Sequence, residues 1–122
     1  MADFTPYIGL PYAVGSTDCW GLVRMIYADH LGIHLPAYLG VEMGPAVGAI
    51  IDDLLASRTW EPVETAQPYD LILLRDGSRL HIGIVIEPGK MIHTMENKNA
   101  CIENYTRPYW ASLAIGFYRY AR

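Results

Sequence analysis

The spacing of the hydrophobic residues changes once along this chain, and that change restricts the folds it can adopt. Residues 19–31 and 47–55 carry apolar side chains at intervals of three and four, which is the repeat of one helical face. From Trp60 onward the apolar runs are short, and turn-forming residues separate them. Helices followed by strands that tight turns connect predict an α+β domain, with N-terminal helices packed on a small antiparallel sheet.

Capping residues bound the first predicted helix. Thr17 and Asp18 are both favourable N-cap residues, so the helix is expected to begin there, and Gly32 is a suitable C-terminal stop. Residues 1–16 are rich in Gly, Pro and Tyr, and we expect them to form an extended arm or loop.

The second helical pattern has an apolar side and an acidic side. Its apolar residues between Val47 and Leu55 share one face, and Asp52 and Asp53 fall on the other. We interpret this acidic pair as a solvent-exposed helix surface, and a catalytic or metal-binding pair is the alternative.

Five short apolar runs are predicted to be strands. They are Leu71–Leu74, His81–Ile86, Met91–Met95, Ala100–Ile102 and Ala114–Tyr120. Asp76-Gly77 and Pro88-Gly89 are turn signals between the first three, which favours antiparallel hairpins.

The size and charge of the chain exclude several classes of protein. With 122 residues, of which 52% are hydrophobic and 18% charged, the chain is expected to be a single domain over residues 1–122. A domain of this length buries about two thirds of its unfolded surface, so it needs no disulfide, metal or cofactor for stability. The net charge is −4 and Lys and Arg do not cluster, so nucleic acid is not an expected partner.

The N-terminal residues and the cysteines bear on the cellular compartment. Met1–Pro6 has neither a basic nor a continuous apolar stretch, so we expect synthesis in the cytoplasm without a signal peptide. Apolar windows such as Ile82–Ile86 are too short to span a membrane. Cys19 and Cys101 are expected to be free thiols, because two cysteines do not make a disulfide framework.

Cys19 is the first candidate for chemistry because it lies in the first turn of the predicted helix. The helix dipole and unpaired amide groups there lower a thiol pKa, and the same amides can hold an oxyanion. We therefore expect Cys19 to have a pKa well below about 8.5 and to react with iodoacetamide faster than Cys101. The alternative is that Cys19 is a small core residue. Cys101, on a late strand, is expected to be buried.

Two histidines on neighbouring predicted strands are the next candidates. His81 shares a strand face with Gly83, whose missing side chain leaves room beside the imidazole. His93 follows the turn at Pro88-Gly89, so an antiparallel hairpin returns it to within about two positions of the residue opposite His81. Whether both rings share one face depends on the loop or on a bulge. If they do, His93 can bind one ring nitrogen of His81 and leave the other to accept a thiol proton.

Other interpretations of these residues remain open. Each histidine alone is more often a structural residue, and Cys19, His81 and His93 together could instead hold a zinc ion with one open position. No close ligand pair supports a zinc site, so we expect no resident metal and no cofactor. His30 and His34 are expected to be exposed residues at the end of the first helix.

Several stretches resemble the motifs of NlpC peptidases, in the order that this family has them. Its Tyr, Gly, Asp-Cys-Ser-Gly-Leu-Val block resembles Pro11-Tyr12, Gly15 and Asp18-Cys19-Trp20-Gly21-Leu22-Val23. Its Gly-Asp-Leu, His-Val-Gly-Ile and third-residue strands resemble Asp70-Leu71-Ile72, His81-Ile82-Gly83-Ile84 and Met91-Ile92-His93.

The resemblance implies a papain-like cysteine peptidase that hydrolyses the γ-D-glutamyl to diaminopimelate bond, or a related amide, in peptidoglycan stem peptides. Carried over by position, it makes Cys19 the nucleophile, His81 the base and His93 the residue that orients the base. Tyr12 would lie near the oxyanion or the substrate carbonyl, and Asp18 would support the start of the helix.

Two positions depart from the family pattern. Trp20 stands where the family has a small Ser, and Tyr69 stands where it has Gly. The resemblance therefore suggests that Trp20 narrows the substrate cleft or forms an apolar wall of it.

The continuation Gly21–Arg24, with the shortness of the chain, most resembles NlpC-type proteins encoded among phage tail genes. This implies a virion tail component that acts at the bacterial cell wall, with a peptidoglycan peptide as substrate and other tail proteins as partners. The alternative is a catalytically silent assembly protein of the same fold, which would dock through aromatic residues near the C-terminus. Those residues are Tyr105, Tyr109, Trp110, Tyr118 and Tyr120.

Overall fold

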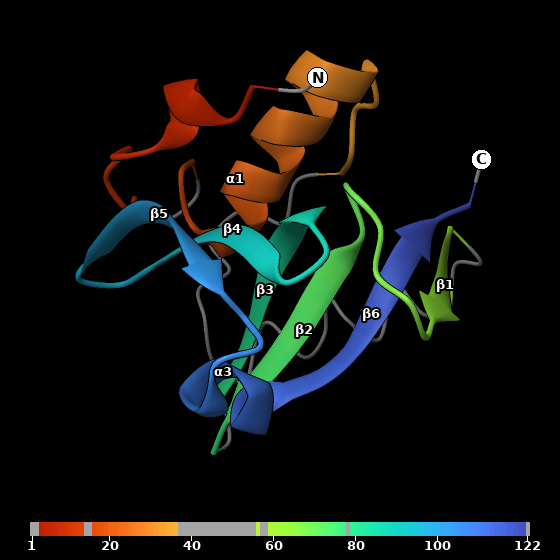
Figure 1. Ribbon diagram of the computed structural model, residues 1–122. Helices are drawn as coiled ribbons and strands as arrows, with labels where there is room; N and C mark the ends of the chain where they lie inside the picture. Colours follow the sequence, from red (N-terminus) through yellow and green to blue (C-terminus); the bar gives the residue numbers. More distant parts are fainter. Residues whose placement is uncertain (1–2, 14–15, 37–55, 57–58, 78, 122) are drawn as a thin grey trace.

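The computed structural model describes residues 3–13, 16–36, 56, 59–77 and 79–121 (Figure 1). The second predicted helix, with Asp52 and Asp53, lies outside the described residues. No helix in the described ranges is long and apolar enough to cross a membrane.

An antiparallel sheet forms the centre of the described structure (Figure 1). Among the described residues it has six strands in the order β1-β6-β2-β3-β4-β5. These are β1 (Trp60–Val63), β2 (Leu71–Asp76), β3 (Arg79–Glu87), β4 (Lys90–Met95), β5 (Lys98–Asn104) and β6 (Ala114–Tyr120). Every neighbouring pair is antiparallel, which confirms the α+β prediction and the five predicted strands.

The first helix begins and ends where capping chemistry predicted. Helix α1 (Cys19–Ile26) continues into a π-helical turn, η2 (Tyr27–Leu31), and Gly32 closes it in the left-handed conformation with φ 67°. The N-cap is Asp18, whose carboxylate accepts the Gly21 N–H at 2.7 Å. Thr17 does not cap the helix, because its hydroxyl donates to the Pro11 carbonyl at 2.6 Å.

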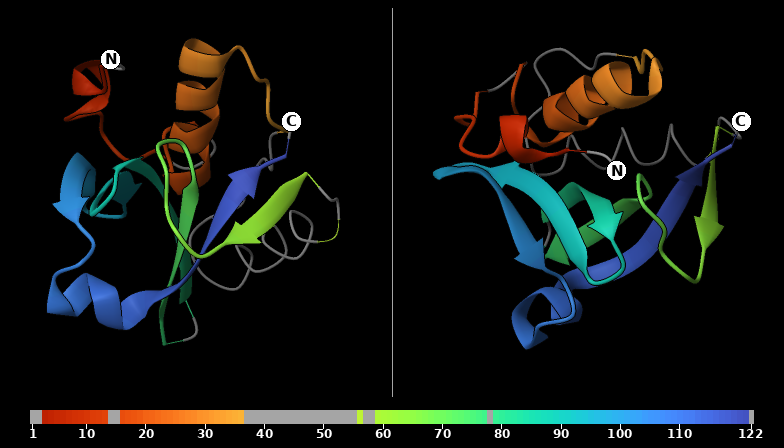
Figure 2. Two further views of the ribbon diagram at one scale, coloured as in Figure 1. Left: turned by 45° about the vertical axis from the view of Figure 1, so that its right-hand side comes forward. Right: turned by 45° about the horizontal axis from the view of Figure 1, so that its top comes forward.

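The main hydrophobic core lies between α1 and the sheet. Helix α1 contacts β3 and β4, and this core includes Leu22, Val23, Ile26, Ile82, Ile84 and Ile92. Because side chains alternate along a strand, His81, Gly83 and Val85 point to the other face of β3. There a second cluster joins Val85 to Trp110 of the short helix α3 (Pro108–Leu113). Figure 2 shows α1 and α3 at opposite ends of the molecule.

Within the described ranges, three short elements differ from the sequence prediction. The 3-10 turn η1 (Thr5–Tyr7) lies in the expected loop, and the Tyr7 hydroxyl donates to Asp29 at 2.7 Å. Strand β1 contains a proline and lacks alternating apolar residues, so its sequence does not predict a strand. It forms because it pairs with β6. Helix α3 is too short for a helical repeat to show.

Tyr69 has a backbone conformation that explains why glycine suits its position. Its φ is 75°, in the left-handed region, which costs a residue with a side chain about 1–2 kcal/mol. Compensating contacts surround it: its amide donates to Val85 at 2.8 Å, and its carbonyl accepts the Tyr27 hydroxyl. Its own hydroxyl hydrogen-bonds His30 Nδ1 at 2.9 Å. The prediction that His30 is exposed is therefore wrong, whereas His34 is exposed as expected.

Candidate active site

Cys19 occupies the first turn of α1 with only 4% of its surface exposed. Burial, followed by the charge of Asp18, raises the pKa of the Cys19 thiol to about 12. The backbone amides of Ile82, Trp20 and Cys19 itself lower this pKa, by less than burial raises it. The predicted low pKa is therefore wrong, because desolvation outweighs the start of the helix. The amide contact nevertheless places the thiol beside β3.

Gly21 allows the loop before α1 to pack directly on the helix. A Cβ atom at this position would lie 1.9 Å from the Ser16 carbonyl oxygen and 2.9 Å from the Asp18 carboxylate. No side chain fits there without a backbone shift. The loop that carries the N-cap is thus held against the turn that carries Cys19.

The pairing of β3 with β4 brings the two predicted histidines onto one face of the sheet. Ile84 pairs with Ile92, and the same register continues to place His93 across from Gly83. A Cβ at Gly83 would lie 3.3 Å from the Cβ of His93, so the glycine does leave room for the neighbouring ring. His81 is two positions from Gly83 and therefore points to the same side.

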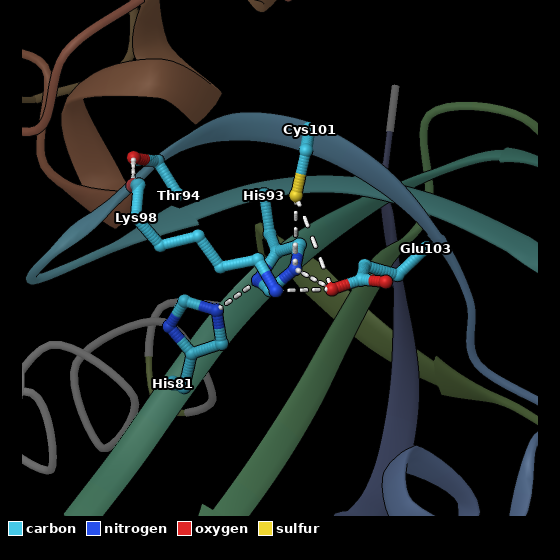
Figure 3. Close-up of polar contacts among 6 residues, drawn as sticks. All are labelled: His81, His93, Thr94, Lys98, Cys101 and Glu103. Carbon is cyan, nitrogen blue, oxygen red and sulfur yellow. Dashed lines mark hydrogen bonds and ion pairs between the residues drawn. The ribbon is translucent and has the colours of Figure 1, made fainter. Parts of the chain in front are cut away.

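The two imidazoles form a buried hydrogen-bonded pair. His81 Nε2 and His93 Nδ1 are 2.8 Å apart, and the rings are 5% and 0% exposed (Figure 3). Burial, followed by the charge of His93, lowers the pKa of His81 to about 3. Burial also lowers the pKa of His93 to about 4, although the nearby Glu103 raises it. Both rings are therefore neutral near pH 7, and one donates to the other.

The second ring nitrogen of His81 is available as a proton acceptor. Within the described parts of the chain, His81 Nδ1 is buried and has no hydrogen-bond partner. It is thus not bonded to Cys19, whose thiol lies against the amide of Ile82, the next residue of β3. Catalytic hydrogen bonds are often long in substrate-free enzymes and shorten when substrate binds.

A polar cluster that sequence reasoning missed lies behind His93 (Figure 3). His93 Nε2 is 3.6 Å from a Glu103 oxygen and 3.9 Å from the Cys101 sulfur. The Lys98 ammonium contacts the same Glu103 oxygen at 2.5 Å, and the Trp110 ring packs on His93 with centroids 4.9 Å apart. Cys101 is half-buried, so the prediction of a buried thiol is wrong.

Strand β5 held a weak signal for this cluster. Residues 101 and 103 alternate onto one strand face, and pairing of Cys101 with His93 turns that face toward the histidine. The sequence does not fix that pairing and therefore does not predict that Glu103 lies beside His93.

The structure places the remaining predicted site residues in different surroundings. Trp20 is 4% exposed, belongs to the core, and donates from its indole to the Pro36 carbonyl at 2.9 Å. It is a core residue next to the equally buried Cys19, and its predicted role of narrowing the substrate cleft or forming an apolar wall of it stays a prediction. Tyr12 is half-buried in the segment before α1. Asp18 supports the helix start as its N-cap.

The thiols are free, and the alternative zinc set of Cys19, His81 and His93 does not come together. Neither Cys19 nor Cys101 forms a disulfide, as expected. In the described part of the chain, the group with metal-ligand spacing is His93, Cys101 and Glu103, not Cys19 with the two histidines.

A cavity of about 290 Å³ opens elsewhere, between the end of η2 and the loop before β2, and its lining includes Asp70 and Arg119. Asp70 is 2% exposed, and the Arg119 guanidinium binds both its oxygens at 2.9 Å. Neither Cys19 nor the histidine pair lines this cavity.

The chain matches the NlpC/P60 family model over residues 9–119. It belongs to the NlpC/P60 family. The sheet with a helix packed on it agrees with solved NlpC/P60 domains. One is the NlpC/P60 domain of the peptidoglycan hydrolase SagA, which is 19% identical with a TM-score of 0.64 and covers 97% of this chain and 92% of that one.

Two other solved structures of the family have larger chains. An NlpC/P60 family protein from Bacillus cereus ATCC 10987 is 28% identical, with a TM-score of 0.68, over 97% of this chain and 38% of its own. A lipoprotein-like NLP/P60 family protein from Staphylococcus aureus subsp. aureus Mu50 is 23% identical, with a TM-score of 0.67. The match covers 96% of this chain and 38% of that one.

Another relative is the Gamma-DL-glutamyl hydrolase of Bacillus subtilis (strain 168). It is 27% identical over 93% of this chain and 27% of its own length. The NlpC/P60 domain described here thus spans about a quarter of that relative.

Proposed function

We propose that this NlpC/P60 domain is a cysteine peptidase that hydrolyses an amide bond in peptidoglycan stem peptides. One observation carries the proposal: the His81 ring is held through Nε2 by His93, while its Nδ1 is buried and unoccupied. The neighbouring amide of Ile82 contacts the Cys19 thiol. Thiol-dependent amide hydrolysis requires a thiol and a neutral, oriented imidazole that come within hydrogen-bonding reach when the substrate binds.

The resting pair is a neutral thiol and a neutral imidazole, so the proton moves as the bond forms. His81 Nδ1 accepts the thiol proton while the sulfur attacks the substrate carbonyl carbon. Amide groups in the first turn of α1 are placed to stabilise the oxyanion. The His81 imidazolium then protonates the leaving amine, which departs and leaves a thioester on Cys19. Water, deprotonated by His81, hydrolyses the thioester and releases the acid.

His93 supports this cycle by keeping the correct nitrogen of His81 free. When His81 Nε2 carries the proton and donates it to His93 Nδ1, the lone pair is on Nδ1, where a base is needed. The same hydrogen bond stabilises the imidazolium that forms during the reaction.

The substrate bond that we propose is γ-D-glutamyl to diaminopimelate. The name of the Bacillus subtilis relative, a Gamma-DL-glutamyl hydrolase, and the motif resemblance both support a glutamyl amide. Delivery to the cell wall by a phage tail rests on the sequence resemblance alone, and mass spectrometry of purified virions would test it.

The test is hydrolysis of purified muropeptides that contain the γ-D-glutamyl-diaminopimelate bond, in buffer with a chelator. Wild-type protein should release a new free amine, detected by chemical labelling and product mass, and Cys19→Ala should not. Cys101→Ala controls for the loss of a thiol as such and should still hydrolyse the peptide. Equal behaviour of wild type and Cys19→Ala would instead favour the docking-protein interpretation.

A further inference from the structure

Behind the histidine pair lie three donor atoms with the spacing of a metal site. His93 Nε2, Cys101 Sγ and a Glu103 oxygen all lie within 4.8 Å of one another, and the pairs are 3.9, 3.9 and 3.6 Å apart (Figure 3). In a tetrahedral zinc site, bonds of about 2.0–2.3 Å put such atoms about 3.4–3.6 Å apart. The cluster therefore needs to contract by only a few tenths of an ångström.

The chain around these donors is already fixed and open to solvent on one side. Pairing of β4 with β5 sets His93 directly beside Cys101, and the His81 bond at Nδ1 leaves Nε2 of His93 as the ligand atom. Cys101 is half-buried and the Glu103 side chain is 25% exposed, so an ion has a path from solvent.

The Glu103 carboxylate already forms an ion pair with the side chain of Lys98. The Lys98 ammonium lies 2.5 Å from the Glu103 oxygen, and its side chain is 40% exposed. A long, partly exposed side chain can turn away at little cost, because exposed ion pairs contribute under about 1 kcal/mol. Lys98 is therefore a competitor that a better-coordinated cation can displace.

We propose that His93, Cys101 and Glu103 form a binding site for a divalent cation of the zinc class, and that its occupation switches off His81. Imidazole, thiolate and carboxylate together are a donor set that zinc binds, and a water molecule would complete the tetrahedron. On binding, the Cys101 thiol releases its proton to solvent. The site stands on its own geometry, and the effect on His81 rests on the proposed function.

The switch follows from counting protons on the two rings. A metal ion on Nε2 of neutral His93 leaves the ring proton on Nδ1, which must then donate to His81 Nε2. His81 therefore carries its own proton on Nδ1 and has no lone pair left for a thiol. Metal binding thus reverses the hydrogen bond that prepares the base, with no change of backbone.

Cobalt spectroscopy tests the site without any assay of activity. Titration with Co²⁺ should produce a thiolate-to-cobalt charge-transfer band in wild type and in Cys19→Ala, and Cys101→Ala should lack it. Glu103→Gln should weaken binding about tenfold or more, whereas Lys98→Met should strengthen it up to about fivefold. Absence of the band in wild type, or its loss in Cys19→Ala but not in Cys101→Ala, would overturn the proposal.

The switch has its own measurement in the NMR signals of the ring nitrogens. Without metal, His81 should be protonated at Nε2, and saturating Zn²⁺ should move the proton to Nδ1. Zn²⁺ should also inhibit muropeptide hydrolysis by wild type, and Cys101→Ala should resist it relative to its own metal-free rate. A cobalt band without a tautomer change would overturn the switch. No hydrolysis even with a chelator would contradict only the proposed function, because the band and the tautomer are read independently.

Discussion

The first turn of α1 and strand β5 each bring a thiol to the strands that carry the histidines, in very different surroundings. Cys19 is 4% exposed, among apolar side chains and backbone amides, and burial raises its pKa to about 12. Cys101 is half-buried among a lysine, a glutamate and a histidine. The more accessible thiol is therefore the one on strand β5, and the thiol at the start of α1 is the buried one. The polar neighbours of Cys101 suit an ion, whereas the α1 thiol adjoins amides that can hold an oxyanion.

The largest expected effect is on kcat when one of the two histidines is replaced. It distinguishes the two thiols, because Cys19 would use His81 as its base and Cys101 would use His93. If Cys19 is the nucleophile, His81→Ala should lower kcat about 10³-fold, whereas His93→Gln should lower it about 10- to 100-fold. His93→Gln is milder because an amide can still accept from His81. Steady-state hydrolysis of the muropeptide measures both, with His30→Ala as a control for loss of a histidine. The opposite ranking would make Cys101, which adjoins His93, the nucleophile.

Gly21→Ala should be the next largest effect, and it concerns only the α1 region. A Cβ there would overlap the Ser16 carbonyl, so the free energy of unfolding should fall by about 3 kcal/mol. Gly116→Ala is the matched control, because its nearest contacts are ring atoms of the movable Tyr118 side chain at 3.3 Å. Urea unfolding of both variants checks this, and equal stabilities would mean that the loop before α1 does not define the position of Cys19.

Acid should destabilise the histidine pair that lies between the two thiol regions. The pKa values of His81 and His93, about 3 and about 4, lie below the unfolded value of about 6.5. The unfolded chain therefore binds more protons, and the stability present above pH 6.5 is lost as the pH falls toward 4. At pH 4.5 the loss for the pair as a whole should be about 2–3 kcal/mol. Urea unfolding against pH, with a chelator, should show a smaller slope in His81→Gln, and an unchanged slope would argue against a neutral buried ring.

The smallest expected effect is the difference in labelling rate between the two thiols. The sequence predicts that Cys19 reacts faster than Cys101, and the structure predicts the opposite order. At pH 8, iodoacetamide should modify Cys101 at least about tenfold faster than Cys19, because Cys19 is more buried and its thiolate is scarce. Peptide mass spectrometry over time measures both rates, and the urea-unfolded chain, in which they should be similar, is the control. Faster labelling of Cys19 would indicate that it already shares an ion pair with His81.

Local chemistry was sufficient to predict much of the fold, and pairing between strands decided the rest. Asp18 and Gly32 marked the ends of the first helical segment because capping depends only on nearby residues. That His81 and His93 share a face depends on the β3–β4 register, which shifts between Val85 and Glu87. An irregularity of that kind leaves no sequence signal.

The other differences from the sequence prediction also depend on contacts between residues that are distant in the sequence. Glu103 joins the site only through the pairing of β4 with β5. Tyr69 holds a glycine-like conformation because residues distant in sequence, among them Tyr27 and Val85, bind its backbone. The expected low pKa of Cys19 failed because the degree of burial is a property of the whole core.

The ion pair of Arg119 with Asp70 limits how far the C-terminal end of this domain can be shortened without loss of stability. Removing residues from 119 onward would leave the Asp70 carboxylate, which is 2% exposed, without its counterion. The free energy of unfolding should then fall by about 3–5 kcal/mol. It would also shorten β6, to which β1 pairs. Shortened versions of the protein should therefore keep Arg119, even though it lies far along the chain from Cys19.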